Sequence, residues 1–196
     1  MIASSPGLIL LDRDGVLNSM VIHSDHGTVD SPLCPSEVEV FPWVPELLRE
    51  LTDRGFMLAV CTNQPSAAKG KTTIELLRGV HQRVLELAQA NGGLISSSHI
   101  CFHRSEDKCI CRKPKPGLLK EAIAMYPSYP PESIWMVGDG ITDVIAGAEI
   151  GIQTAFLGPK KCDACHIFEK NSCTPTFWGK DLRDFFQYII DHKQRR

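Results

Sequence analysis

Short apolar runs alternate along this chain with segments of helical periodicity. Five runs are typical of buried strands: Leu8–Leu11, Met57–Cys61, Ile100–Phe102, Ile134–Val137 and Thr154–Leu157. They lack the alternation of apolar and polar residues that marks a half-exposed strand. Because helical segments separate most of them, we expect an α/β fold with a Rossmann-like parallel sheet flanked by helices.

The helical segments each have an apolar face. Val44, Leu47, Leu48 and Leu51 recur at helical spacing. Thr72 and Glu75 form a capping box that predicts a helix ending before Gly92-Gly93. Three more helices are expected, over 118–126, over 143–150, and over the segment that carries Leu182, Phe185, Phe186, Ile189 and Ile190.

Two long segments, 18–42 and 158–180, show neither the apolar runs of a buried strand nor the apolar spacing of a helix. Loops of this length in a compact domain are usually functional or disordered. The full length of 196 residues is that of a single domain, so we expect residues 1–196 to form one.

Carboxylates follow two of the predicted strands. Asp12 and Asp14 come directly after the first strand, and Asp139 and Asp143 come after another. In parallel sheets ligands bind beyond the carboxyl ends of the strands. Carboxylates brought together there repel one another, and a hard cation such as Mg²⁺ removes that penalty. The alternative interpretation is a simple turn at 12–15 and a helix cap at Asp143.

Such a pair of carboxylates suits phosphate transfer. One carboxylate can attack as a nucleophile and form an aspartyl-phosphate, while the other exchanges a proton with the leaving oxygen. A hydroxyl and a cation would hold the phosphoryl oxygens. Thr62 and either Lys113 or Lys115 are the candidates for these two roles.

Four short motifs carry a family resemblance. Asp12-Arg13-Asp14-Gly15-Val16, Thr62-Asn63-Gln64, Arg112-Lys113-Pro114, and Gly138-Asp139 with Asp143 resemble the motifs of the haloacid dehalogenase-like phosphohydrolases, in the same order. The resemblance implies the fold of that family without a large cap domain. It also implies that Asp12 is the nucleophile, Asp14 the acid and base, and that Thr62 and Lys113 hold the phosphoryl group. Mg²⁺ would be bound by Asp12, by the Asp14 backbone carbonyl and by Asp139, with Asp143 behind them.

A cluster of metal-binding residue types precedes Lys113. Cys101, His103, Cys109 and Cys111 supply three thiolates and an imidazole, a complete tetrahedral set for structural Zn²⁺ in a loop over about 101–111. A chance group of free thiols is the alternative. Cys162, Cys165, His166 and Cys173 form a second group, for which we favour unliganded residues over another metal.

The zinc-loop pattern narrows the resemblance to the branch that holds the D-glycero-D-manno-heptose 1,7-bisphosphate phosphatases and the histidinol-phosphate phosphatases. Asp25-His26-Gly27-Thr28, Asn63, Gln64 and Arg112 resemble substrate-binding residues of the heptose enzymes. The short gap from His103 to Cys109 is nearer to the histidinol type, and Gly140 stands where the heptose enzymes often have lysine. The implied activity is removal of the 7-phosphate from the heptose bisphosphate, in the synthesis of nucleotide-activated heptose. Histidinol-phosphate phosphatase, another small sugar-phosphate phosphatase and a catalytically silent zinc-stabilised binding module are the alternatives.

Composition restricts the partners. Apolar residues make up 43% of the chain and charged residues 22%, and the formal net charge is −2. With no basic stripe and no long apolar run, we expect no nucleic-acid partner and no membrane partner. The first apolar run ends at Asp12, so no signal peptide is expected. We expect a cytoplasmic monomer whose partner is a small phosphorylated sugar.

Overall fold

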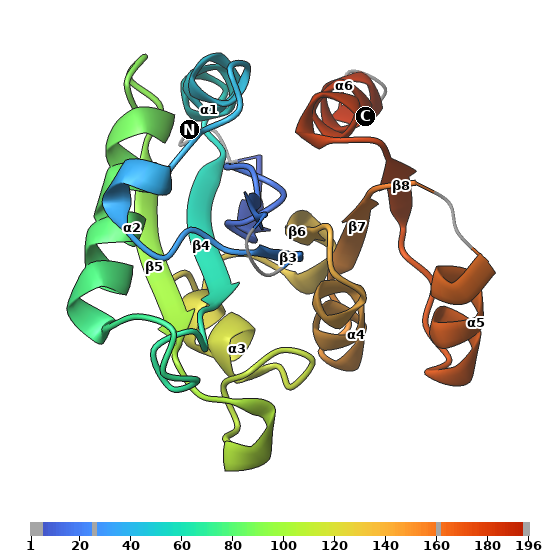
Figure 1. Ribbon diagram of the computed structural model, residues 1–196. Coiled ribbons are helices and arrows are strands. Elements are labelled where there is room, and N and C mark those ends of the chain that lie inside the picture. Colours follow the sequence, from blue (N-terminus) through green and yellow to red (C-terminus); the bar gives the residue numbers. More distant parts are fainter. Residues whose placement is uncertain (1–5, 25–26, 160–161, 194–196) are drawn as a thin grey trace.

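The computed structural model describes residues 6–24, 27–159 and 162–193. Its centre is a six-stranded sheet in the order β5-β4-β1-β6-β7-β8, in which every neighbouring pair is parallel (Figure 1). The strands are β1 (Leu8–Leu11), β4 (Met57–Asn63), β5 (Ile95–Cys101), β6 (Ile134–Gly138), β7 (Gln153–Leu157) and β8 (Phe177–Gly179). The predicted parallel sheet is confirmed.

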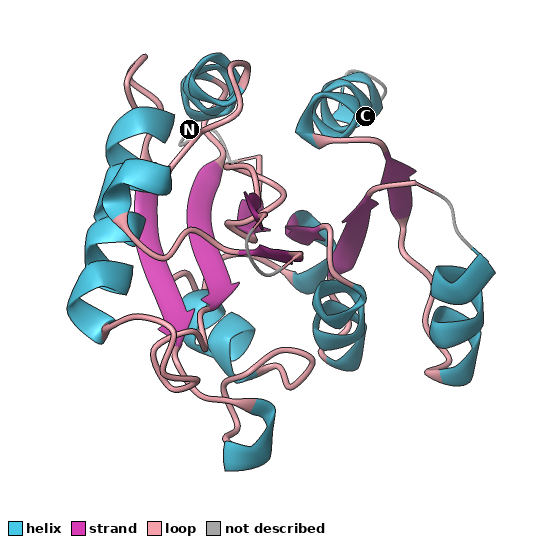
Figure 2. Cartoon of the chain, in the orientation of Figure 1, coloured by secondary structure: helices cyan, strands magenta, loops and turns pink. Residues whose placement is uncertain are grey.

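Helices cover both faces of the sheet (Figure 2). They are α1 (Val44–Asp53), α2 (Ile74–Ala88), α3 (Gly117–Ala124), α4 (Ile141–Glu149), α5 (Cys162–Lys170) and α6 (Leu182–Lys193). Ile9 and Leu11 of β1 pack with the apolar faces of α1, α2 and α6, whereas Leu8 and Leu10 pack with α3 and α4. Because successive side chains of a strand point to opposite faces, four apolar residues in β1 supply both layers of the core.

Two sequence expectations need correction. β5 begins at Ile95 rather than Ile100, because an edge strand tolerates the polar residues Ser96, Ser97 and Ser98. The side chain that caps α2 is Thr73, whose Oγ1 accepts from the Leu76 N–H; the Thr72 hydroxyl instead donates to the Leu33 carbonyl.

The two irregular segments contain regular elements. The first holds the antiparallel hairpin of β2 (Val21–His23) and β3 (Thr28–Asp30) and the 3₁₀ turn Pro35–Glu37. The second holds α5 and β8, whose packing depends on Phe156, Phe168 and Trp178. Two further 3₁₀ turns are Ser105–Asp107 and Pro131–Ser133. None of the helices in the described ranges is long and apolar enough to cross a lipid bilayer.

Candidate active site

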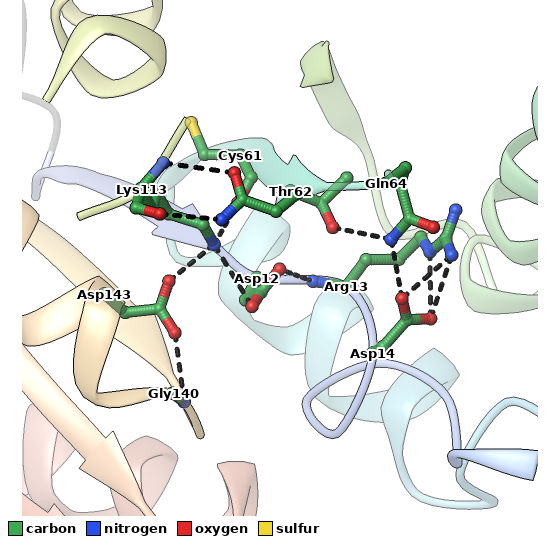
Figure 3. A network of polar contacts seen from close by, with 10 residues as sticks. Asp12, Arg13, Asp14, Cys61, Thr62, Gln64, Lys113, Gly140 and Asp143 are labelled. Atoms are coloured by element: carbon green, nitrogen blue, oxygen red, sulfur yellow. Dashed lines mark hydrogen bonds and ion pairs between the residues drawn. The ribbon is translucent and has the colours of Figure 1, made fainter. Parts of the chain in front are cut away.

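The predicted catalytic side chains meet at the carboxyl ends of β1, β4 and β6, which are neighbours in the sheet. Asp12 follows β1, Thr62 is the residue before the last of β4, and Asp139 follows β6. Lys113 reaches the same place from the loop between β5 and α3 (Figure 3). The sheet order therefore joins residues that are up to 127 positions apart, since 139 − 12 = 127.

Lys113 is the central cation of the site. It is 2% exposed, and its Nζ donates to the Cys61 carbonyl at 2.7 Å. The same nitrogen pairs with Asp143 Oδ1 at 2.5 Å and Asp12 Oδ2 at 3.1 Å. Burial alone would lower the pKa of Lys113, but Asp12 and Asp143 raise it above its ordinary value overall. The lysine is therefore a permanent positive charge beside Asp12.

Only one of the two candidate lysines lies in the site. The Nζ of Lys115 donates to the backbone carbonyls of Lys108 and Cys109 at 2.9 Å each, within the loop that carries the cysteines. Lys113 thus lies beside Asp12, and its contact with phosphate stays a prediction.

Asp12, Asp139 and Asp143 form a carboxylate group whose ligand atoms lie within 4.8 Å of one another. Burial and then the charges of Asp12 and Asp143 raise the pKa of Asp139 to about 7, although the residue still reaches solvent. Burial likewise raises the pKa of Asp143 to about 6, against the opposing effect of Lys113. One lysine does not balance the negative charge of three neighbouring carboxylates, so the site favours an added cation. A donor set made only of oxygen atoms fits Mg²⁺.

Gly15 lets this carboxylate group form. Its φ is +79°, and a Cβ at this position would overlap the Asp139 carboxylate. Any other residue would therefore be strained and would displace Asp139.

Asp14 does not join this group of carboxylates. Its carboxylate accepts hydrogen bonds from Nε and Nη2 of Arg13 and, at 2.6 Å, from Nε2 of Gln64 (Figure 3). It also accepts from Nδ2 of Asn18 at 2.8 Å. Arg13 and Asn18 are fully buried and Asp14 is 8% exposed. The sequence analysis missed Arg13 and Asn18, although Arg13 lies between the two aspartates.

Asn63 and Gln64 contact protein groups in this structure, whereas the resemblance assigned both to the substrate. The Asn63 amide exchanges two hydrogen bonds with the backbone of Lys113, at 3.0 and 3.1 Å. Gln64 is 1% exposed and donates to Asp14 and to Thr62 Oγ1. Both side chains hold other site residues, and their contact with substrate stays a prediction.

The predicted substrate segment at 25–28 is described only in part. Asp25 and His26 lie outside the described residues. Gly27 and Thr28 are exposed at the turn of the β2–β3 hairpin. An ion pair between Lys71 and Asp30 ties this hairpin to the segment before α2. Contact of these residues with substrate stays a prediction.

The four zinc-ligand candidates converge. Their sulfur atoms lie 3.3 to 3.7 Å apart, and His103 Nδ1 is 3.3 Å from Cys111 Sγ and 3.6 Å from Cys101 Sγ. In a tetrahedral zinc site with bonds of about 2.3 Å, sulfur atoms are about 3.8 Å apart, whereas a disulfide requires about 2.05 Å. The thiols are free, and the group fits a zinc ion.

The second cysteine group is different. The described atoms of Cys165, His166 and Cys173 do not form a metal-binding group with one another, and the Cys162 side chain lies outside the description. His166 pairs instead with Glu169 on α5.

A cationic hollow adjoins Lys113. It has a volume of about 290 Å³ and is lined by Arg104, Lys108, Arg112, Lys113, Lys115 and Thr142, among others. Arg112 is tied to the zinc loop, because its Nη1 donates to the His103 carbonyl at 3.2 Å. The sequence identified Arg112 as a candidate but not Arg104 and Lys108, because nothing in their local sequence distinguishes them from ordinary charged surface residues.

Comparisons with known proteins agree with this geometry. A family model described as HAD-hydrolase-like matches residues 110–185. The D-glycero-beta-D-manno-heptose-1,7-bisphosphate 7-phosphatase of Neisseria meningitidis serogroup A is 32% identical over 93% of this chain and 94% of its own length. The chain belongs to the haloacid dehalogenase-like (HAD-like) phosphatases. This confirms the predicted family and the predicted phosphoric ester hydrolase.

One further relative and one solved structure extend the comparison. A phosphatase of the same name from Pseudomonas aeruginosa is 35% identical over 78% of this chain and 82% of its own length. A D,D-heptose 1,7-bisphosphate phosphatase from B. bronchiseptica, crystallised with magnesium and phosphate, superimposes with a TM-score of 0.77 at 24% identity. The match covers 95% of this chain and 99% of that one, so the two share a fold over nearly their full lengths.

Proposed function

We propose that this HAD-like phosphatase removes the 7-phosphate of D-glycero-D-manno-heptose 1,7-bisphosphate. The cationic hollow beside Lys113 is the observation that carries the choice of substrate. A bisphosphate brings a second dianion, and Arg104, Lys108 and Arg112 offer it cationic donors next to the reacting phosphate. The names of the relatives in Neisseria and Pseudomonas support the same substrate.

The hollow also separates the two leading substrates. Histidinol phosphate carries one phosphate and an amino group, so its leaving group would bring positive charge toward a pocket lined by five cationic side chains. Like charges placed together in this way oppose binding. The heptose bisphosphate is favoured although the zinc loop is short.

The proposed chemistry gives each group one role. Asp12 Oδ attacks phosphorus, a P–O bond forms on Asp12 and the bond to the sugar oxygen breaks. Lys113 and the Thr62 hydroxyl hold the phosphoryl oxygens, and Asp14 gives a proton to the sugar oxygen. Water then attacks the aspartyl-phosphate, Asp14 takes a proton from it, and inorganic phosphate leaves.

Asp14 must move during this cycle. Its carboxylate is turned toward Arg13 and Gln64 rather than toward Asp12 (Figure 3). It also accepts from Asn18. Because the carboxylate points away from Asp12, the step that donates a proton to the leaving oxygen requires Asp14 to rotate away from these donors.

Two metals belong to the proposal. Asp12, Asp139 and the backbone carbonyl of Asp14 would hold Mg²⁺, which supplies positive charge to the transferring phosphoryl group. Zn²⁺ at Cys101, His103, Cys109 and Cys111 would fix the loop that carries Arg112 and Lys113. A cytoplasmic monomer that serves the synthesis of nucleotide-activated heptose remains the expected setting.

Phosphate release with Mg²⁺ tests the substrate. The panel contains both anomers of the heptose 1,7-bisphosphate, the heptose 7-phosphate, histidinol phosphate, fructose 1,6-bisphosphate and a 3′-phosphorylated oligonucleotide. We expect kcat/KM to be highest for one heptose anomer and Asp12→Asn to be inactive on every ester. A higher kcat/KM for histidinol phosphate would overturn the substrate assignment.

A pair of variants tests the hollow itself. Arg104→Gln and Lys108→Gln should each raise KM for the bisphosphate about tenfold, the effect of one lost hydrogen bond to a charged group. KM for the heptose 7-phosphate should change much less, because that ester has no second phosphate. Equal changes for both esters would show that the hollow does not hold the second phosphate.

A further inference from the structure

The amide of Gln64 contacts two residues with separate proposed roles. Its Nε2 donates to Asp14 Oδ2 at 2.6 Å and to Thr62 Oγ1 at 3.0 Å. All three residues are buried, with exposures of 1% for Gln64, 1% for Thr62 and 8% for Asp14. Figure 3 shows the amide between them, with Asp14 on the side away from Lys113.

Chemistry fixes the direction of these hydrogen bonds. An ionised carboxylate only accepts, so Gln64 must present its NH₂ group to Asp14. The two hydrogens of that group then serve Asp14 and Thr62. Because the amide nitrogen does not accept, the hydroxyl proton of Thr62 points elsewhere and is left to donate to a phosphoryl oxygen.

Gln64 is also one of the donors that keep Asp14 beside the site. Arg13 and Asn18 hold the same carboxylate, but neither contacts Thr62 through a described hydrogen bond. Gln64 therefore links the residue proposed to hold phosphate with the residue proposed to transfer the proton.

We propose that Gln64 is a positioning residue that couples phosphate engagement at Thr62 to release of Asp14, an inference that rests on the proposed phosphatase activity. When the Thr62 hydroxyl donates to phosphate, its oxygen becomes a stronger acceptor, because hydrogen bonds in a chain polarise one another. The Gln64 amide is drawn toward Thr62, and its second N–H then holds Asp14 less strongly. Asp14 can turn toward the leaving oxygen once phosphate is in place.

Two esters separate the roles of Thr62 and Asp14. The sugar oxygen of the heptose bisphosphate needs a proton to leave, whereas the acidic phenol of p-nitrophenyl phosphate leaves without one. The kcat/KM of the aryl ester therefore reports how phosphate is held. The ratio of kcat/KM for the heptose ester to kcat/KM for the aryl ester reports Asp14.

Gln64→Met keeps the size of the side chain and removes both donors. We expect kcat/KM for the aryl ester to fall about tenfold, because the Thr62 hydroxyl loses its fixed direction. The ratio should rise about threefold or more, because Asp14 has lost one of the donors that hold it back. In Gln64→Glu the new carboxylate repels Asp14 and accepts a hydrogen bond from Thr62. This variant should lower kcat/KM for the aryl ester further and raise the ratio of heptose to aryl kcat/KM further.

The controls keep the result interpretable. Gln82→Met makes the same substitution on the exposed face of α2 and should change neither value. Asn63→Ala removes two hydrogen bonds to the backbone of Lys113, so it should lower kcat/KM for both esters by the same factor. Circular dichroism and zinc content confirm that each variant is folded.

Each outcome has one meaning. A raised ratio in Gln64→Met and Gln64→Glu supports the coupling. An unchanged ratio would show that Gln64 acts only on Thr62 or on the fold, and a lowered ratio would show that it places Asp14 for proton transfer; both overturn the inference and leave the phosphatase activity standing. A wild-type protein inactive on both esters would overturn the proposed function as well.

Discussion

His81, behind the active site, should make the protein less stable in acid. It lies on α2, is 8% exposed, and its two ring nitrogens are buried without a hydrogen-bond partner among the described residues. The pKa of His81 is lowered from 6.5 to about 4, first by burial and then by the charge of Arg13, against the opposing effect of Asp14. The imidazole is therefore neutral in the folded protein at neutral pH.

The direction and size of the effect follow from linkage. A histidine with a lowered folded pKa binds fewer protons folded than unfolded, so its contribution is present above pH 6.5 and is lost as the pH falls toward 4. With these two pKa values, the free energy of unfolding should fall by about 2 kcal/mol between about pH 8 and about pH 5 on account of His81 alone.

His81→Leu should remove this part of the pH dependence. Urea unfolding followed by circular dichroism at several pH values gives the free energy of unfolding for both proteins. The wild type should lose about 2 kcal/mol more than the variant over that interval. Val84→Ala, one turn further along α2 and also buried, is the matched control and should lower stability equally at every pH.

Parallel curves for wild type and His81→Leu would refute the reasoning. They would mean that the imidazole takes up its proton as easily in the folded protein as in the unfolded chain. Burial next to Arg13 would then have no electrostatic consequence.

Three further predictions concern the metals and the turn after Asp12. Gly15→Ala should lower the free energy of unfolding by about 1 to 2 kcal/mol, because the position has a positive φ, and thermal unfolding measures this. It should also lower kcat at least tenfold in steady-state kinetics, because the new Cβ displaces Asp139. Retained activity would show that Gly15 is not needed for the metal site. Cys109→Ser should lower bound zinc and the unfolding temperature, and unaltered metal content would contradict a structural zinc site. Brief treatment with EDTA should abolish phosphate release and added Mg²⁺ should restore it, provided zinc content stays constant; turnover in EDTA would contradict the carboxylate–Mg²⁺ interpretation.

Local sequence was enough to predict the sheet and most of its helices. Leu8–Leu11 is apolar on both sides of the strand, which only a sheet covered on both faces can bury. Three of the four motifs were readable because they stand at the ends of strands, and parallel strands end at one edge of a sheet. The zinc candidates were readable because all four lie within eleven residues.

Elements stabilised by distant contacts were not predictable. β8 and α5 depend on aromatic packing among Phe156, Phe168 and Trp178, which are brought together only by the fold. The polar run at 96–98 became part of a strand because β4 pairs with it.

The sequence by itself determined which groups are available at the site: two aspartates after β1, a threonine at the end of an apolar run, and two candidate lysines beside a zinc-type loop. The tertiary structure decided how they are used. It placed Lys113 rather than Lys115 beside Asp12, turned Asp14 toward Arg13 and Gln64, and arranged the lysines and arginines of residues 104–115 around one hollow. The physical reason is that hydrogen-bond partners and charge neighbours depend on distances in space, and only the packing of the sheet and its loops fixes those distances.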